Sequence, residues 1–123
     1  MFNQRPVVEH KLWTANSIAA GQNESTAAID LSQIAQDGTF SIKYTVTGTG
    51  TCKFEYNLCD TKTGTFIEPS GASDIASSIT ASSGTSGTDW VSFSPILAPF
   101  MKIKCTETGS SNAVVVTLSV FTQ

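Results

Sequence analysis

Residues 40–59, FSIKYTVTGTGTCKFEYNLC, contain the clearest pattern in the chain. Apolar and polar side chains alternate from Phe40 to Val46 and again from Cys52 to Leu58. Alternation with a period of two predicts a β-strand with one buried face, because successive side chains of a strand point to opposite sides of the sheet. Gly48 and Gly50 separate the two segments, so we expect two strands joined by a tight hairpin.

The same alternation recurs near the C-terminus, in residues 101–106 (MKIKCT) and 114–121 (VVVTLSVF). Turn-forming residues at 109–112 lie between them, which predicts a C-terminal hairpin. Weaker strand signals lie at 11–18, 27–31, 65–68 and 89–94. Because helical periodicity is nearly absent, we expect an all-β fold. It is predicted to be a two-sheet antiparallel β-sandwich of about eight strands, either jelly-roll-like or immunoglobulin-like.

Two segments fall outside this pattern. Residues 1–9 show no clear alternation, and we expect them to form an N-terminal arm before a single domain over 10–123. Residues 69–88 (PSGASDIASSITASSGTSGT) are small and polar, which predicts a long loop with room for a short helix or strand near 74–79. A chain of 123 residues fits one such domain.

The charge pattern excludes several kinds of partner. Charged residues make up 14% of the chain, against about 25% in an average soluble domain, and the net charge is −3. We therefore expect no binding to nucleic acid or to a membrane surface, since both need clustered Lys and Arg. The start, MFNQRPVVEH, lacks the apolar run of a signal peptide, so we expect folding in a cytoplasm.

Candidate catalytic groups are few. His10 is the only histidine in the sequence, and we expect it at the surface. The spacing of Cys52, Cys59 and Cys105 is not that of metal ligands. By strand alternation Cys52 and Cys105 point inward as neighbouring thiols, and Cys59 points outward. The sequence therefore predicts no enzyme, no metal site and no cofactor.

Two further pairs of residues were weighed as sites. Glu55 and Glu107 could flank a sugar as a carboxylate pair. Glu55 shares its outer strand face with Lys53, and Lys102 and Lys104 lie on the outer face of another strand, so we expect cross-strand surface ion pairs instead. Trp90 and Trp13 are large enough to stack on a sugar or to anchor a protein contact, but Trp90 could equally cover the edge of the sandwich.

Three segments carry a resemblance to a known class of protein: 46–56 (VTGTGTCKFEY), 66–75 (FIEPSGASDI) and 100–109 (FMKIKCTETG). With them, the chain resembles small β-sandwich structural proteins of tailed bacteriophage virions, from about residue 28 to the C-terminus. Such proteins include capsid decoration (cement) proteins and tail or fibre modules. The resemblance implies a non-catalytic role in the virion and supplies no site residues.

From this resemblance we expect a capsid decoration protein that is made in the host cytoplasm and binds the assembled shell in the virion. Its partners would be the major capsid protein or other virion proteins, and sister subunits, with a trimer as the first guess because oligomers favour closed symmetry. The alternatives are a tail, neck or fibre module, or a host-glycan-binding module. The candidate contact residues are Phe2, Asn3, Gln4, Arg5, Pro6, Ser70, Asp74 and Trp90.

Overall fold

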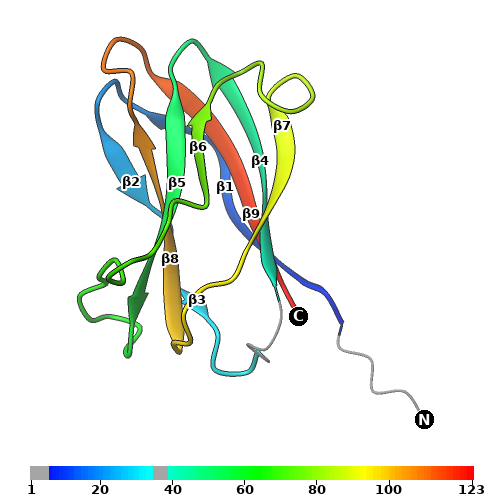
Figure 1. The fold of residues 1–123 in the computed structure, drawn as a ribbon, viewed down its shortest axis with the longest axis vertical. Helices are drawn as coiled ribbons and strands as arrows, with labels where there is room; N and C mark the ends of the chain where they lie inside the picture. Colours follow the sequence, from blue (N-terminus) through cyan, green and yellow to red (C-terminus); the bar gives the residue numbers. More distant parts are fainter. Residues whose placement is uncertain (1–5, 35–38) are drawn as a thin grey trace.

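The computed structural model describes residues 6–34 and 39–123, and these form two antiparallel sheets packed face to face (Figure 1). The first sheet has the order β1-β9-β4-β7, and the second has the order β2-β8-β5-β6 with β3 also paired to β8. The expected all-β sandwich is confirmed. The strands are β1 (Val8–Ile18), β2 (Asn23–Ser25), β3 (Ile29–Asp30), β4 (Phe40–Gly48), β5 (Cys52–Cys59), β6 (Ala76–Ile79), β7 (Thr88–Phe93), β8 (Phe100–Glu107) and β9 (Val114–Thr122).

The strand order distinguishes between the two predicted architectures. Since β2 and β3 both pair with β8, they act as one interrupted strand, and each sheet has four strand positions. Between these positions the chain changes sheet at every connection except the one from β5 to β6. This is the arrangement of a jelly roll, whereas an immunoglobulin sandwich divides its strands differently between the sheets.

Both expected hairpins are wrong. Strands β4 and β5 belong to different sheets, and so do β8 and β9, so residues 48–51 and 108–113 cross from one sheet to the other. Alternation says that each strand has one buried face. It does not say whether the next strand lies beside it or across the core, because both arrangements bury the same side chains.

The core between the sheets consists of the inward-facing residues predicted from the alternation. Their side chains are buried, as expected: Phe40, Ile42, Tyr44, Val46, Cys52, Phe54, Tyr56, Leu58, Met101, Ile103, Cys105, Val114, Val116, Leu118 and Val120. Rings from the two sheets meet across the core, with the centroids of Tyr44 and Phe54 5.4 Å apart. Each large apolar side chain buried in this way contributes about 1.5–3 kcal/mol.

Several predicted boundaries differ from the structure. The predicted arm over 1–9 is too long by two residues, since β1 begins at Val8, which pairs with Thr122. Val8 and Glu9 show no apolar alternation, but β9 is long enough to pair with them through Thr122 and Phe121. The predicted strand 65–68 is reduced to a single bridge between Leu58 and Ile67. The short element expected near 74–79 inside the loop 69–88 is present as the strand β6.

A buried carboxylate closes one end of the sandwich. Glu107 is only 1% exposed, and its carboxylate accepts hydrogen bonds of 2.7–3.0 Å from the backbone N–H groups of Gly21, Thr51, Gly109 and Ser110. These donors belong to the three crossovers β1–β2, β4–β5 and β8–β9. Hydrogen bonds from Gly21, Thr51 and the other two donors favour the charged form and lower the pKa of Glu107 to about 2. One side chain therefore fixes three connections.

Candidate functional site

The predicted contact residues do not form a single site. Four of them lie outside the described residues: Phe2, Asn3, Gln4 and Arg5. Pro6 is exposed just before β1. Ser70 and Asp74 line one cleft of about 450 Å³, between the β5–β6 connection and the end of β7. Trp90 does not line this cleft and lies instead on the outer face of the first sheet.

The end of the sandwich opposite Glu107 exposes large apolar side chains. Ile67 is 65% exposed and Leu97 is 69% exposed, and both line a shallow hollow of about 400 Å³. We call the apolar part of this hollow the end patch, and it consists of Leu58, Ile67, Pro69, Leu97, Ala98 and Pro99. Exposed apolar side chains that gather in this way make the end patch a candidate for protein contact.

The local sequence explains why these side chains stay outside the core. Residues 94–99 read SPILAP, and Pro95 and Pro99 cannot donate to a strand ladder. The segment follows β7 and precedes β8 without joining either sheet, although the Pro99 carbonyl accepts a 2.7 Å hydrogen bond from the N–H of Leu31. Ile67 and Leu58 exchange two backbone hydrogen bonds of 2.8 and 3.0 Å, which hold Ile67 beside the end of β5. The end patch therefore rests on fixed backbone.

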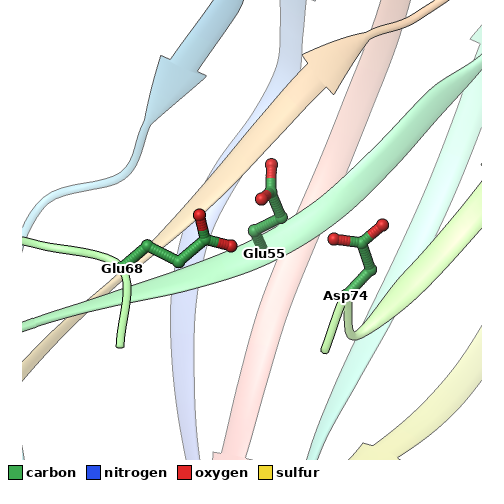
Figure 2. Close-up of side chains that lie close together, drawn as sticks. All are labelled: Glu55, Glu68 and Asp74. Carbon is green, nitrogen blue, oxygen red and sulfur yellow. The ribbon is translucent and has the colours of Figure 1, made fainter. Parts of the chain in front are cut away.

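Three carboxylates meet on the outer face of the second sheet, where Glu68 and Asp74 flank Glu55 (Figure 2). Their nearest oxygens lie within 4.8 Å of one another. Lys53 Nζ lies 3.4 Å from Glu55 Oε1 and 3.9 Å from Asp74 Oδ1. Glu55 is therefore paired with a lysine, as expected, but with one of its own strand rather than across strands, and its side chain is buried. A hydrogen bond with Glu55 and repulsion from its charge raise the pKa of Glu68.

The carboxylate cluster has a positional consequence. Glu55 belongs to β5, whereas Glu68 and Asp74 belong to the connection that follows β5. Lys53 lies between Glu55 and Asp74, so it links the Asp74 end of this connection to β5.

Trp90 lies on the outer face of the first sheet, opposite Lys43 of the neighbouring β4. Its ring centroid is 4.8 Å from that of Phe121 on β9, and Lys43 Nζ is 5.5 Å from the centre of the indole ring. Despite these contacts Trp90 remains 54% exposed. Trp90 therefore covers part of the sheet face and still offers ring surface to a partner.

The histidine and the three cysteines differ in burial and in their contacts. His10 is partly buried rather than fully at the surface; its Nε2 lies 3.0 Å from Thr122 Oγ1, and burial lowers its pKa. Cys52 and Cys105 are buried neighbours, as expected, and their mutual hydrogen bond and burial raise the pKa of the Cys105 thiol. Cys59 is partly exposed.

Sequence reasoning did not find the end patch or the role of Glu107, although a signal existed for each. Two adjacent large apolar residues between prolines, as in SPILAP, have no strand in which to alternate. Glu107 continues the inward series 101, 103 and 105, so strand alternation placed a carboxylate in the interior. It cannot pair with Glu55, which faces outward beside Lys53.

No protein-family model and no curated protein matches the chain. Among residues 6–34 and 39–123 there is no helix of the length and apolar character needed to cross a membrane. Function is therefore inferred from the fold, the surfaces and the resemblance described above.

Proposed function

We propose that this chain is a non-catalytic structural protein of a tailed-phage particle, which decorates the capsid by binding the assembled shell. The resemblance over residue 28 to the C-terminus supports this proposal. The jelly-roll arrangement is compatible with it, because viral capsid proteins use this architecture, as lectins do. The same fold occurs in proteins with many different functions, so the fold alone cannot carry the proposal. The proposal rests chiefly on the exposed end patch.

The observation that carries the proposal is the end patch. Ile67 and Leu97 are exposed on backbone that the β-bridge and the prolines hold in place, so their side chains form a surface ready for contact. Removing such side chains from water favours association, at about 25 cal/mol per Å² of apolar area. The patch would face the shell, and the adjacent cleft with Ser70 and Asp74 would add polar contacts at its rim.

The function is tested by quantitative mass spectrometry of purified particles from the source of the chain. A copy number near that of the major shell protein, or a simple fraction of it, is expected for a decoration protein. A few copies per particle would move the protein to the tail, neck or fibres. Complete absence from particles would overturn the virion role.

The contact surface is tested by adding purified protein to particles that lack it. The variants Ile67→Ser and Leu97→Ser are expected to bind about tenfold or more weakly, in the manner of residues at the centre of an interface. Val7→Ser is the matched control, because Val7 is also 65% exposed but lies at the N-terminal side. Weak binding of Val7→Ser with normal binding of Leu97→Ser would assign attachment to the arm instead.

Sister subunits are the second expected partner. Light scattering of the purified chain should give the mass of a trimer if the oligomer forms before attachment. A monomer in solution that nevertheless binds particles would place any contact between sister subunits on the shell.

A further inference from the structure

The outer face of the first sheet combines an exposed aromatic ring with a polar groove. Trp90 and Phe121 form the aromatic part, with Lys43 beside them. A groove of about 270 Å³ begins at Lys43 and runs over β4, β9 and β1. Lys43 therefore borders both the exposed ring and the groove, and joins them into one continuous surface.

Hydroxyl groups form the middle of this groove. Thr45 of β4 is paired with Thr117 of β9, and Ser119 is paired with Lys43 on one side and Lys11 on the other. Thr45 Oγ1 lies 2.9 Å from Thr88 Oγ1, and Thr117 Oγ1 accepts a 3.0 Å hydrogen bond from the Ala15 N–H. Because a hydroxyl can donate one hydrogen bond and accept two, each keeps capacity for a ligand that carries hydroxyl groups of its own. Trp13 adds a second indole at the β1 side.

The charges that line the groove favour an acidic ligand over a neutral one. Lys11, Lys43 and Glu9 line it, which leaves an excess of one positive charge on a chain whose net charge is −3. Both ion pairs found in the described part of the chain belong to Lys53, so no carboxylate pairs with Lys11 or Lys43 there. The Lys43 ammonium group lies over the Trp90 ring, 5.5 Å from its centre, so it stands close to any sugar that contacts this ring. Both ammonium groups are suited to a carboxylate, because charge-assisted hydrogen bonds are about twice as strong as neutral ones.

We propose that this face binds an acidic oligosaccharide. The apolar C–H face of one sugar ring packs on Trp90, and the carboxylate of the sugar binds Lys43. The next sugar unit lies in the groove and exchanges hydrogen bonds with Thr45, Thr117 and Ser119. The site shares no residue with the end patch, so it is independent of the proposed attachment to a shell.

The test is an NMR titration of the full-length isotope-labelled chain with trigalacturonic acid. Shifts are expected for the indole N–H of Trp90 and for the amides of Lys43 and Ser119. The fully methyl-esterified trisaccharide, which has the same rings without the charges, should bind about tenfold or more weakly. Equal binding of the ester, shifts elsewhere, or no shifts up to about 10 mM would overturn the proposal.

Variants locate the site. Trp90→Ala and Lys43→Met should each weaken binding about tenfold, and Lys43→Met retains an apolar side chain while it removes the charge. Lys62→Met is the control, because it removes another exposed positive charge, from the β5–β6 connection. If Trp90→Ala does not fold, Lys43→Met still tests the proposal, because Lys43 is exposed and its replacement should leave the fold intact. Normal binding by Lys43→Met would overturn the proposal.

Discussion

The two ends of the sandwich use their residues in opposite ways. At one end Glu107 is buried and accepts hydrogen bonds from backbone N–H groups of three crossovers. At the other end Ile67 and Leu97 are exposed, and the connections there leave apolar side chains in water. Strands β5 and β8 run between the two ends, from the pair Cys52–Glu107 to the pair Cys59–Phe100 (Figure 1).

This difference indicates that one end stabilises the fold and that the other is suited to binding. The Glu107 end satisfies its polar groups within the chain, which stabilises the fold and leaves little to offer a partner. The patch end leaves apolar surface exposed, which is the surface that we propose for contact with the shell. Changes at the Glu107 end should therefore alter stability, and changes at the patch end should alter binding.

The largest effect is expected for Glu107→Ala. It leaves backbone N–H groups of three crossovers without their acceptor, and unsatisfied donors are costly. We expect the melting temperature to fall by on the order of 10 °C. Calorimetry measures it, with Glu24→Ala on the exposed strand β2 as the control. A fall of less than about 2 °C for Glu107→Ala would show that the end is held by other contacts.

The pH dependence of stability should follow the same side chain. Glu107 has a pKa of about 2 in the folded protein, below its ordinary value of 4.5. The stability that it contributes is therefore present above about pH 4.5 and is lost as the pH falls towards 2. Between about pH 5 and pH 2, the melting temperature should fall more steeply for the unchanged protein than for Glu107→Gln.

A parallel fall in both proteins would contradict this account. The carboxylate cluster also changes stability with pH. Glu55 raises the pKa of Glu68, so the contribution of Glu68 to stability increases as the pH falls, opposite to that of Glu107. Both proteins contain the cluster, so the difference between their curves isolates Glu107.

Substitution of one glycine near each end allows the packing at the two ends to be compared. A Cβ at Gly50 would stand 2.5 Å from the carbonyl oxygen of Asn112, so Gly50→Ala should cost about 1–3 kcal/mol by overpacking. A Cβ at Gly71 would meet nothing within 4 Å. Gly71→Ala should cost about 1–2 kcal/mol, from its positive φ of 77° alone. Urea unfolding measures both, and a larger loss for Gly71→Ala would reverse the comparison.

The smallest effect on stability is expected at the patch. Leu97→Ser should change the free energy of unfolding by less than about 0.5 kcal/mol, because the side chain is already in water. Urea unfolding of the isolated chain checks this. A loss above about 1 kcal/mol would mean that Leu97 contributes to the core, and its effect on particle binding would then lose its meaning.

The sequence predicts the inner face of each strand but not its neighbours. Alternation placed Phe54 and Ile103 in the core, because the period of a strand is a local property. The order of the strands depends on how the crossovers at 48–51 and 108–113 pack on each other, which involves residues distant in sequence. Gly50 is an example, since its N–H donates a 3.2 Å hydrogen bond to the carbonyl oxygen of Ala113.

The candidate sites follow the same rule. The shared outer face of Lys53 and Glu55 was predictable, because strand alternation is a local property. The joining of Ile67 and Leu97 into one patch was not, since it depends on two loops that meet only in the folded chain.

The most direct test of the account is a cryo-electron microscopy reconstruction of particles that carry this protein. The account predicts a sandwich whose patch end, with Ile67 and Leu97, faces the shell, and whose Glu107 end points to solvent. Density with the Glu107 end against the shell, or a shell without any sandwich on it, would contradict the account.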